Sequence, residues 1–155
     1  MILLVHLLFG AAIGSLVNNI PLAIILAFLS HYLLDFIPHI EYPIKNITEK
    51  KWKKSLPDFV KVFLDFLLGI ILIFIFSNPA LPAGRQAIIY VCAFMAILPD
   101  GLAILTNFSA SKILKTHNDI HHEQVHFLRD KKISNFWRIA SQVAVAIISV
   151  LLLKT

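Results

Sequence analysis

Cysteine is almost absent from this sequence, which contains Cys92 alone among 155 residues. A single cysteine cannot form an intramolecular disulfide, so the chain is not a disulfide-stapled domain. Cys92 lies inside a long apolar run, where a small buried thiol usually serves packing. We therefore assign no chemistry to it.

Charged residues are scarce as well, at 15%, while apolar residues make up 58% and the mean hydropathy is +0.80. An ordinary soluble domain is about 45–50% apolar even when glycine is counted. The length leaves room for one domain, residues 1–155. A soluble fold of this size could not bury so many long apolar runs. The composition therefore predicts an all-α integral membrane protein, a polytopic helical bundle.

The net charge of +5 does not indicate a nucleic-acid-binding protein. The lysines fall between the apolar runs, and no basic stripe alternates with exposed aromatic residues. A signal peptide is not indicated either, because no positive charge precedes the first apolar run and His6 interrupts it. The nucleophile motif GxSxG is also missing, so no motif of this kind demands chemistry from the chain.

Five apolar segments approach the length of about 20 helical residues that crosses a bilayer. They cover residues 2–17, 21–37, 59–76, 86–105 and 136–153, and the first two are short. Asn18 and Asn19 before Pro21 predict a tight turn that makes the first two spans an antiparallel hairpin. Gly10 and Gly14 give the first span a small-xxx-small face, on which another helix can pack closely.

The connections between the spans differ in charge. Residues 41–56 carry five lysines and residues 110–133 carry five lysines or arginines, whereas residues 77–85 carry only Arg85. With five spans, the two basic connections lie on one side of the membrane. The positive-inside rule places that side and the N-terminus in the cytoplasm, which predicts a protein of the plasma (bacterial inner) membrane.

Ionisable side chains inside the predicted spans are few, and each is costly, at about 2.5–3.5 kcal/mol on insertion scales. Measured along the helices at ~1.5 Å per residue, five of them lie within roughly 5–12 Å of the basic side. They come from four different spans: His6, His31, Asp35, Asp65 and Asp100. The predicted topology depends on the lysines and arginines of the connections and not on these five residues. Their shared depth is therefore independent evidence for a functional site.

His31, Asp35 and His39 follow one another at intervals of four residues. This spacing places them on one stripe of a helix, unless Pro38 ends the helix first. Two imidazoles and a carboxylate on such a stripe suit a borderline metal such as zinc. The basic connection after the fourth span holds a second cluster, with two histidine pairs spaced by four: His117/His121 and His122/His126.

Simpler interpretations stay open for several of these residues. Asp65 lies four residues after Lys61 and can form a structural salt bridge with it. Asp100, between a proline and a glycine, can cap a broken helix. A lone intramembrane histidine such as His6 is often a packing residue. The second cluster, between His117 and His126, can belong to an amphipathic segment on the lipid surface.

The stretch from Ser30 to His39 resembles the HxxxDxxPH signature of small bacterial membrane proteins described as membrane-bound metal-dependent hydrolases. It is similar, more distantly, to the histidine–aspartate helix of zinc-dependent phospholipase C and its nuclease relatives. The resemblance implies an all-helical fold that hydrolyses a phosphoester with one to three divalent metal ions, zinc being the first candidate. The implied metal ligands are His6, His31, Asp35, His39, Asp100, His121, His122 and His126. The late segment reads HxxxH here, where the soluble phospholipases carry HxxxE.

The leading hypothesis is therefore a metal-dependent hydrolase in the cytoplasmic leaflet, acting on a phospholipid or another membrane-associated phosphoester. A catalytic aspartate that is not a ligand, Asp65 or Asp100, would orient or deprotonate the water. The lysine-rich connections would attract anionic headgroups.

Two alternatives belong to other classes. A transporter of divalent metal ions or protons also places carboxylates and histidines inside the membrane, but it needs polar groups at successive depths. Residues 70–76 contain no polar side chain, which disfavours such a path. A membrane scaffold whose metal only pins its helices is the second alternative, and the sequence does not separate it from the enzyme.

Overall fold

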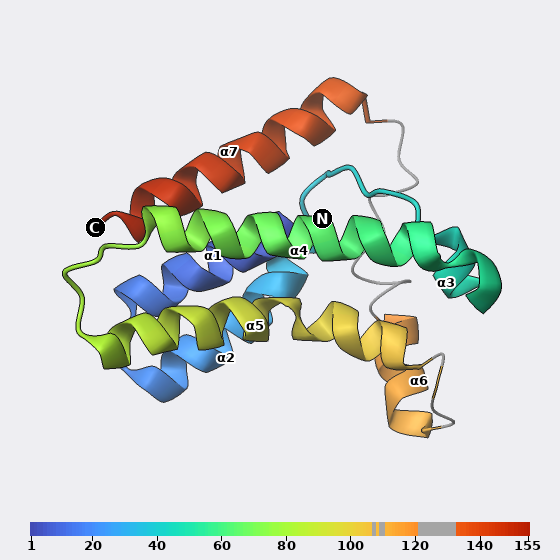
Figure 1. The fold of residues 1–155 in the computed structure, drawn as a ribbon, viewed down its shortest axis with the longest axis horizontal. Helices are drawn as coiled ribbons and strands as arrows, with labels where there is room; N and C mark the ends of the chain where they lie inside the picture. Colours follow the sequence, from blue (N-terminus) through green and yellow to red (C-terminus); the bar gives the residue numbers. More distant parts are fainter. Residues whose placement is uncertain (107, 109–110, 121–132) are drawn as a thin grey trace.

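The computed structural model describes residues 1–106, 108, 111–120 and 133–155, and these residues form helices and connecting segments without any strand (Figure 1). The helices are α1 (Leu3–Leu16), α2 (Ile20–Asp35), α3 (Lys45–Thr48), the 3-10 helix η1 (Trp52–Lys54), α4 (Leu56–Phe76), α5 (Ala83–Leu105), α6 (Lys112–Ile120) and α7 (Asn135–Leu153). The predicted all-α fold is confirmed for this part of the chain.

Each of the five predicted apolar segments coincides with a helix. Within the described residues, three helices are long and apolar enough to cross a membrane, namely α4, α5 and α7. The helices α1 and α2 have 14 and 16 residues and are shorter, as predicted. At 1.5 Å per residue, α1 rises only ~21 Å, less than the ~30 Å of a hydrocarbon core.

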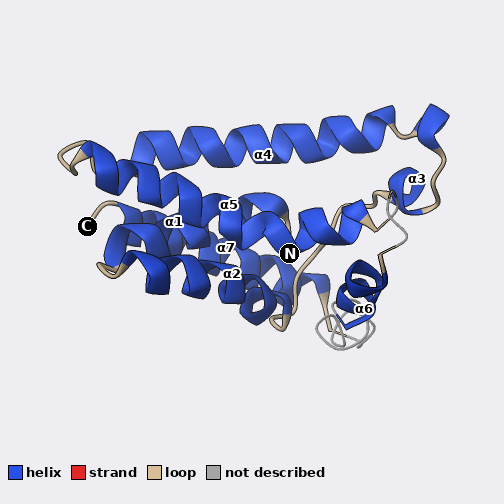
Figure 2. Ribbon diagram, turned by 90° about the horizontal axis from the view of Figure 1, so that it is seen from below, coloured by secondary structure: helices blue, strands red, loops and turns tan. Residues whose placement is uncertain are grey.

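Helix α1 is the central helix and contacts α2, α4, α5 and α7 (Figures 1 and 2). Nine of its 14 residues are buried. The surrounding helices turn apolar side chains outward, among them Phe74 at 75% exposure and Leu64 at 57%. Soluble monomers rarely expose continuous apolar faces of this extent. The burial pattern fits a bundle whose solvent is lipid, and α1 can be short because its neighbours shield it.

The turn between α1 and α2 is built as predicted. The Asn19 side chain caps α2, because its Oδ1 accepts a hydrogen bond from the Leu22 amide at 3.0 Å. Pro21 stands in the first turn of α2, where its missing N–H has no intrahelical partner to lose. Since the two helices are joined by three residues and contact each other, they form the predicted hairpin.

Gly10 and Gly14 pack directly on α5. A Cβ at Gly10 would lie 2.5 Å from Ala96 Cβ and 2.6 Å from the Cys92 carbonyl oxygen. A Cβ at Gly14 would lie 2.9 Å from the Ile88 carbonyl oxygen. Real Cβ atoms do not approach other atoms so closely, so the absence of a side chain lets the two backbones meet. The predicted close-packing face of α1 is confirmed, with buried Cys92 as part of the packing.

Charged residues of neighbouring helices satisfy both ends of α1. At its C-terminus, Arg85 of α5 donates hydrogen bonds to the carbonyl oxygens of Val17, at 2.7 Å, and Gly14, at 3.4 Å. At its N-terminus, which has no side-chain cap of its own, Asp65 of α4 accepts a hydrogen bond from the Leu4 amide at 3.3 Å. Both charges complement the helix dipole, so they fix the height of α1 in the bundle.

The described parts of the two basic connections lie at the same end of the bundle. Figure 1 shows α3 and α6 together at one end, with the C-terminus and the α4–α5 connection at the other. The five lysines of the first basic connection lie within or between α3 and η1, and Lys112 and Lys115 belong to α6. The asymmetry predicted from the sequence is therefore present in the fold.

Candidate metal centre

Five of the predicted ligands meet where α1 begins, α2 ends and α5 passes. They form what we name the His/Asp cluster: His6 of α1, His31 and Asp35 of α2, His39 of the segment after α2, and Asp100 of α5. Four of the five residues are buried, and the Asp100 side chain is 32% exposed. The structure thus brings these residues together, while metal binding by them stays a prediction.

Asp35 lies at the centre of the cluster. Its Oδ1 is 3.2 Å from His6 Nε2 and 3.9 Å from His39 Nε2, and its Oδ2 is 3.1 Å from His31 Nε2. The amino group of Met1 lies 2.5 Å from Oδ1. A buried carboxylate is tolerated only when it is paired or coordinated. The partners of the Asp35 carboxylate come from Met1 before α1, from α1 and α2 themselves, and from the segment that follows α2.

Helix α2 ends at Asp35, so the predicted helical stripe holds for His31 and Asp35, and the alternative in which the helix ends before His39 is confirmed. Pro38 disfavours a helical conformation for the residue before it, which is consistent with the chain leaving the helix here. His39 still turns back to the cluster, and its Nε2 lies 2.8 Å from Glu41 Oε1. Glu41 was not among the predicted site residues, and its only signal in the sequence is its position two residues after His39.

Backbone carbonyl groups fix the tautomer of two histidines. His31 Nδ1 lies 2.8 Å from the Ala96 carbonyl oxygen, and His39 Nδ1 lies 2.6 Å from the Ile37 carbonyl oxygen. A carbonyl oxygen only accepts hydrogen bonds, so each Nδ1 carries a proton and donates it. The other ring nitrogen, Nε2, is therefore the one left to face the cluster.

Each of these Nε2 atoms points at carboxylate oxygens. His31 Nε2 is 3.1 Å from Asp35 and 3.6 Å from Asp100, and His39 Nε2 is 2.8 Å from Glu41. In a neutral imidazole whose Nδ1 is protonated, Nε2 is an acceptor, so two acceptors face each other. Such contacts require a proton or a metal ion between the two acceptors.

His6 is fully buried; its Nε2 lies 3.2 Å from Asp35 Oδ1 without meeting hydrogen-bond geometry, and its Nδ1 makes no hydrogen bond with a described residue. Its ring stacks on that of His31, with centroids 4.2 Å apart and planes 25° apart. One ligand atom from each of His6, His31 and Asp100 lies within 4.8 Å of the others. A buried imidazole without hydrogen bonds is costly unless something else binds it. The three residues can hold a metal ion, and the donor set fits one.

Asp65 does not form the salt bridge considered above. Its Oδ2 accepts hydrogen bonds from the Leu4 amide at 3.3 Å and from the Tyr42 hydroxyl at 3.2 Å. Lys61 instead lies 3.4 Å from Asp58 Oδ1, so the Lys61–Asp65 interpretation is wrong. Burial and the neighbouring Asp65 carboxylate raise the pKa of Tyr42, which keeps its hydroxyl a donor at neutral pH.

Asp100 does not cap a helix end, and that interpretation is wrong too. Helix α5 runs on from Ala83 to Leu105 with Pro99 inside it. A proline within a helix removes one backbone hydrogen bond and bends the axis. Asp100 follows that position, 3.6 Å from His31 Nε2.

The second histidine cluster is described only at its start. His117 of α6 lies outside the His/Asp cluster, and its Nε2 is 2.8 Å from the Tyr32 hydroxyl. This contact connects α6 to α2, and Tyr32 was not singled out by the sequence. His121, His122 and His126 lie outside the described residues, so their predicted roles as ligands are untested.

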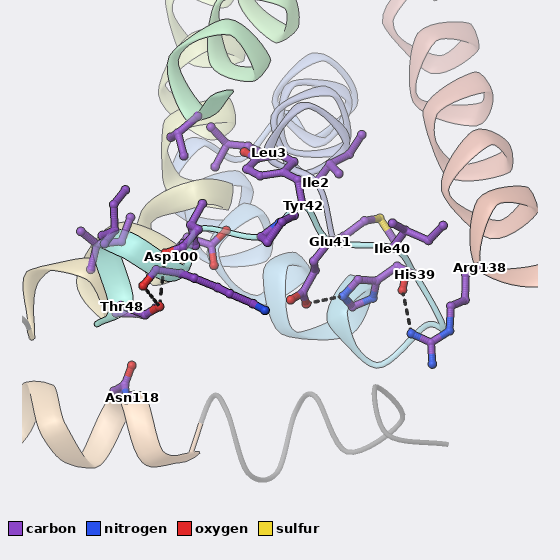
Figure 3. Close-up of a pocket in the computed structure, with 18 of the residues that line it drawn as sticks. Ile2, Leu3, His39, Ile40, Glu41, Tyr42, Thr48, Asp100, Asn118 and Arg138 are labelled. Carbon is purple, nitrogen blue, oxygen red and sulfur yellow. Dashed lines mark hydrogen bonds and ion pairs between the residues drawn. The ribbon is translucent and has the colours of Figure 1, made fainter. Parts of the chain in front are cut away.

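A cavity of about 740 Å³ adjoins the cluster (Figure 3). Met1, His39 and Asp100 are among its lining residues, together with residues of α4, α7 and the segment that leads into α3. Binding sites for small molecules usually measure about 300–1,000 Å³. The cluster can therefore be reached from a space large enough for a substrate.

Comparison of the chain with models of protein families, with characterised proteins and with solved structures gave no match. The cluster and the cavity are the features of the molecule that indicate a role. Together they place imidazole and carboxylate donors beside a space that a ligand can enter.

Proposed function

We propose that the protein is an integral-membrane, metal-dependent hydrolase that cleaves a phosphoester bond at the His/Asp cluster. The observation that carries the proposal is the geometry of His31 and His39. Each donates from Nδ1 to a backbone carbonyl group and turns Nε2 toward carboxylate oxygens. Metal-binding histidines are commonly held in this way, because the outer hydrogen bond fixes the tautomer that leaves Nε2 free for the metal.

Five donors are available to hold metal, namely His6, His31, Asp35, His39 and Asp100. Imidazole and carboxylate donors without a thiolate suit zinc, and they also suit manganese or iron. Five donors are more than one tetrahedral zinc ion uses. We propose one to three ions, the higher number involving the histidines at 121, 122 and 126.

A bound divalent ion supplies Lewis acidity toward water and toward a phosphoryl oxygen. One tetrahedral ion needs only four of these five donors, so we assign to Asp100, which is the most exposed of them and lines the cavity, the acceptance of a proton from water. Asp65 is not among the residues that line the cavity, and its Oδ2 is engaged by Leu4 and Tyr42. Of the two aspartates considered as catalytic, Asp100 is therefore the better placed.

The end of the bundle that carries α3 and α6 is proposed to face the cytoplasm across a bacterial plasma membrane. Its lysines would attract anionic headgroups, by ~1 kcal/mol for each residue near the surface. The substrate is accordingly a phospholipid or another membrane-associated phosphoester. The resemblance of residues 30–39 to membrane-bound metal-dependent hydrolases supports the same assignment.

A transporter of metal ions or protons is the less favoured function. A transport path needs polar groups along the whole depth of the bundle. In the central helix α1, His6 is followed by ten residues, from Leu7 to Leu16, of which Ser15 alone has a polar side chain. Between His6 and Ser15 the side chains of α1 thus offer no polar group to a path.

The test is hydrolysis by detergent-purified protein of bis-p-nitrophenyl phosphate, p-nitrophenyl phosphate and a phospholipid. We expect EDTA to abolish turnover and zinc or manganese to restore it. Asp100→Asn should lower kcat by about 10²–10⁴-fold, the usual worth of a general base. The exposed Asp119→Asn is the matched control and should leave kcat unchanged. Metal binding without hydrolysis of any of the three substrates would contradict the enzyme and leave a scaffold with a structural metal.

A further inference from the structure

The cavity is lined by both apolar and positively charged residues. Ile2, Ile40 and Ile104 give it an apolar wall, while Lys45 and Arg138 bring cationic groups from two different elements, α3 and α7. A small soluble anion would leave the apolar wall without contacts, and a hydrocarbon would leave the two cationic groups without a counter-ion. The lining therefore fits a ligand that has both an anionic group and an apolar chain.

Arg138 stands close to the His/Asp cluster. Its Nη1 lies 3.5 Å from the carbonyl oxygen of His39, and Figure 3 shows the two residues side by side at the cavity. A guanidinium group presents several donors in a plane and binds phosphate oxygens in pairs. A phosphate group held by Arg138 would thus lie next to the cluster.

Two carboxylates, Glu41 and Asp100, also line the cavity and would repel an unscreened anion. Glu41 is paired with His39, whose Nε2 lies 2.8 Å away. Asp100 lies 3.6 Å from His31 Nε2, beside the metal of the proposed function. Each negative charge therefore has its own partner on the side of the cluster, and Lys45 and Arg138 add positive charge to the cavity.

The cavity also reaches the membrane-facing part of the bundle. Val62 of α4 and Asn135 of α7 both line it, so it lies between the N-terminal parts of two helices long enough to span a membrane. Exposed apolar side chains flank it on both, with Phe63 at 60% exposure on α4 and Trp137 at 65% on α7. A ligand that enters between these helices comes from the lipid phase.

Resting on the proposed function, we infer that this cavity binds a phosphate-bearing amphiphile taken from the bilayer, with its phosphate on Arg138 and Lys45 and the start of its chain against the isoleucines. The size of the cavity is that of a drug-sized ligand, so it holds a headgroup and the first part of a chain rather than a whole lipid. The class of substrate is therefore an anionic phosphate lipid and not a soluble phosphate ester.

The experiment measures binding to EDTA-treated protein in a nonionic detergent, so that neither metal nor turnover contributes. The probes are dodecyl phosphate, inorganic phosphate and dodecanol. We expect dodecyl phosphate to bind at least tenfold more tightly than either of the other two. Ile104→Ser should weaken dodecyl phosphate several-fold and leave inorganic phosphate unchanged.

Charge variants test the anion site. Arg138→Gln and Lys45→Gln should each weaken dodecyl phosphate about five- to tenfold, and Arg138→Lys should fall between Arg138→Gln and the wild type. Lys154→Gln, which removes a positive charge at the opposite end of α7, is the matched control and should bind like the wild type. Because Lys45 is exposed, Lys45→Gln gives a result even if the Arg138 variants fold poorly.

The inference is overturned if dodecyl phosphate binds no more tightly than inorganic phosphate, or if Arg138→Gln and Lys45→Gln both bind like Lys154→Gln. Its failure is separable from that of the proposed function. Binding of dodecyl phosphate without hydrolysis of any phosphoester contradicts the hydrolase alone. Equal kcat/KM for p-nitrophenyl phosphate and for dodecyl p-nitrophenyl phosphate contradicts this inference alone.

Discussion

The carboxylate of Asp65, in the apolar helix α4, accepts a hydrogen bond from the backbone amide of Leu4, 3.3 Å away in the first turn of α1. The same oxygen accepts a hydrogen bond from the Tyr42 hydroxyl at 3.2 Å. One carboxylate of α4 thus joins this helix to α1 and to the segment that carries His39. Because His6 lies two residues beyond Leu4, this contact helps to set the position of the His6 ring.

Replacing Asp65 should therefore separate a structural role from a catalytic one. Asp65→Asn keeps an acceptor oxygen and is expected to retain most of the thermal stability and metal content. Asp65→Leu leaves the Leu4 amide and the Tyr42 hydroxyl without this acceptor, which should cost about 1–3 kcal/mol. Thermal melting of the two variants in detergent measures the difference, with Glu49→Gln at the surface as the control. If Asp65→Asn kept its stability and metal but lost all turnover, Asp65 would be the base instead of Asp100.

Gly10 is expected to tolerate no side chain. A Cβ there would lie 2.6 Å from the Cys92 carbonyl oxygen, so Gly10→Ala must push α1 away from α5. We expect a clear fall in melting temperature and, because His6 is one turn earlier on α1, a lower metal content. Gly84→Ala is the control, since a Cβ at Gly84 meets nothing within 4 Å. Equal melting temperatures for the two variants would contradict the close packing of α1 on α5.

The Tyr32 hydroxyl is expected to hold α6 on the bundle. Tyr32→Phe removes the 2.8 Å contact with His117 Nε2 while keeping the ring. Hydrogen exchange should then rise in residues 112–120 and stay unchanged in α1, and metal content should not fall, because His117 lies outside the cluster. Tyr90→Phe, within the apolar part of α5, serves as the control. A loss of metal in Tyr32→Phe alone would show that α6 contributes to the centre.

Removal of metal is expected to destabilise the fold. The cluster gathers groups from α1, α2 and α5, so an ion bound to it links three helices. A ligand present at 1,000 times its dissociation constant stabilises the native state by about 4 kcal/mol. Chelation should lower the melting temperature by roughly 10 °C, at ~2–4 °C for each kcal/mol in a chain of this size. Readdition of zinc should reverse the shift in the wild type and not in His31→Ala.

Much of this architecture follows from local patterns in the sequence. Apolar run length located the five helices, Asn19 and Pro21 marked the α1–α2 turn, and Gly10 and Gly14 marked a close helix contact. These features depend on residues near one another in the chain, which is why they could be predicted.

Pairing between distant residues could not be predicted in the same way. Asp65 accepts a hydrogen bond from Leu4, which lies 61 positions earlier in the sequence. Lys61 lies one helical turn from Asp65 but donates a hydrogen bond to Asp58 instead. Continuation of α5 through Pro99 depends on tertiary packing, because proline by itself favours a break. The cluster could be predicted because its histidines and aspartates lie at similar depths in the predicted spans. Glu41 could not be predicted, because it meets His39 through a bend of the backbone after α2, and such a bend leaves no regular spacing in the sequence.

The most direct test of the metal centre is elemental analysis of the purified protein by inductively coupled plasma mass spectrometry, with the wild type beside His31→Ala/Asp35→Ala and the control His117→Ala. We predict at least one equivalent of zinc, manganese or iron in the wild type and in His117→Ala, and its loss from the double variant. Absence of metal from the wild type, even after reconstitution with each ion, would contradict the account. A proton would then lie between Nε2 of His31 and its carboxylate partners.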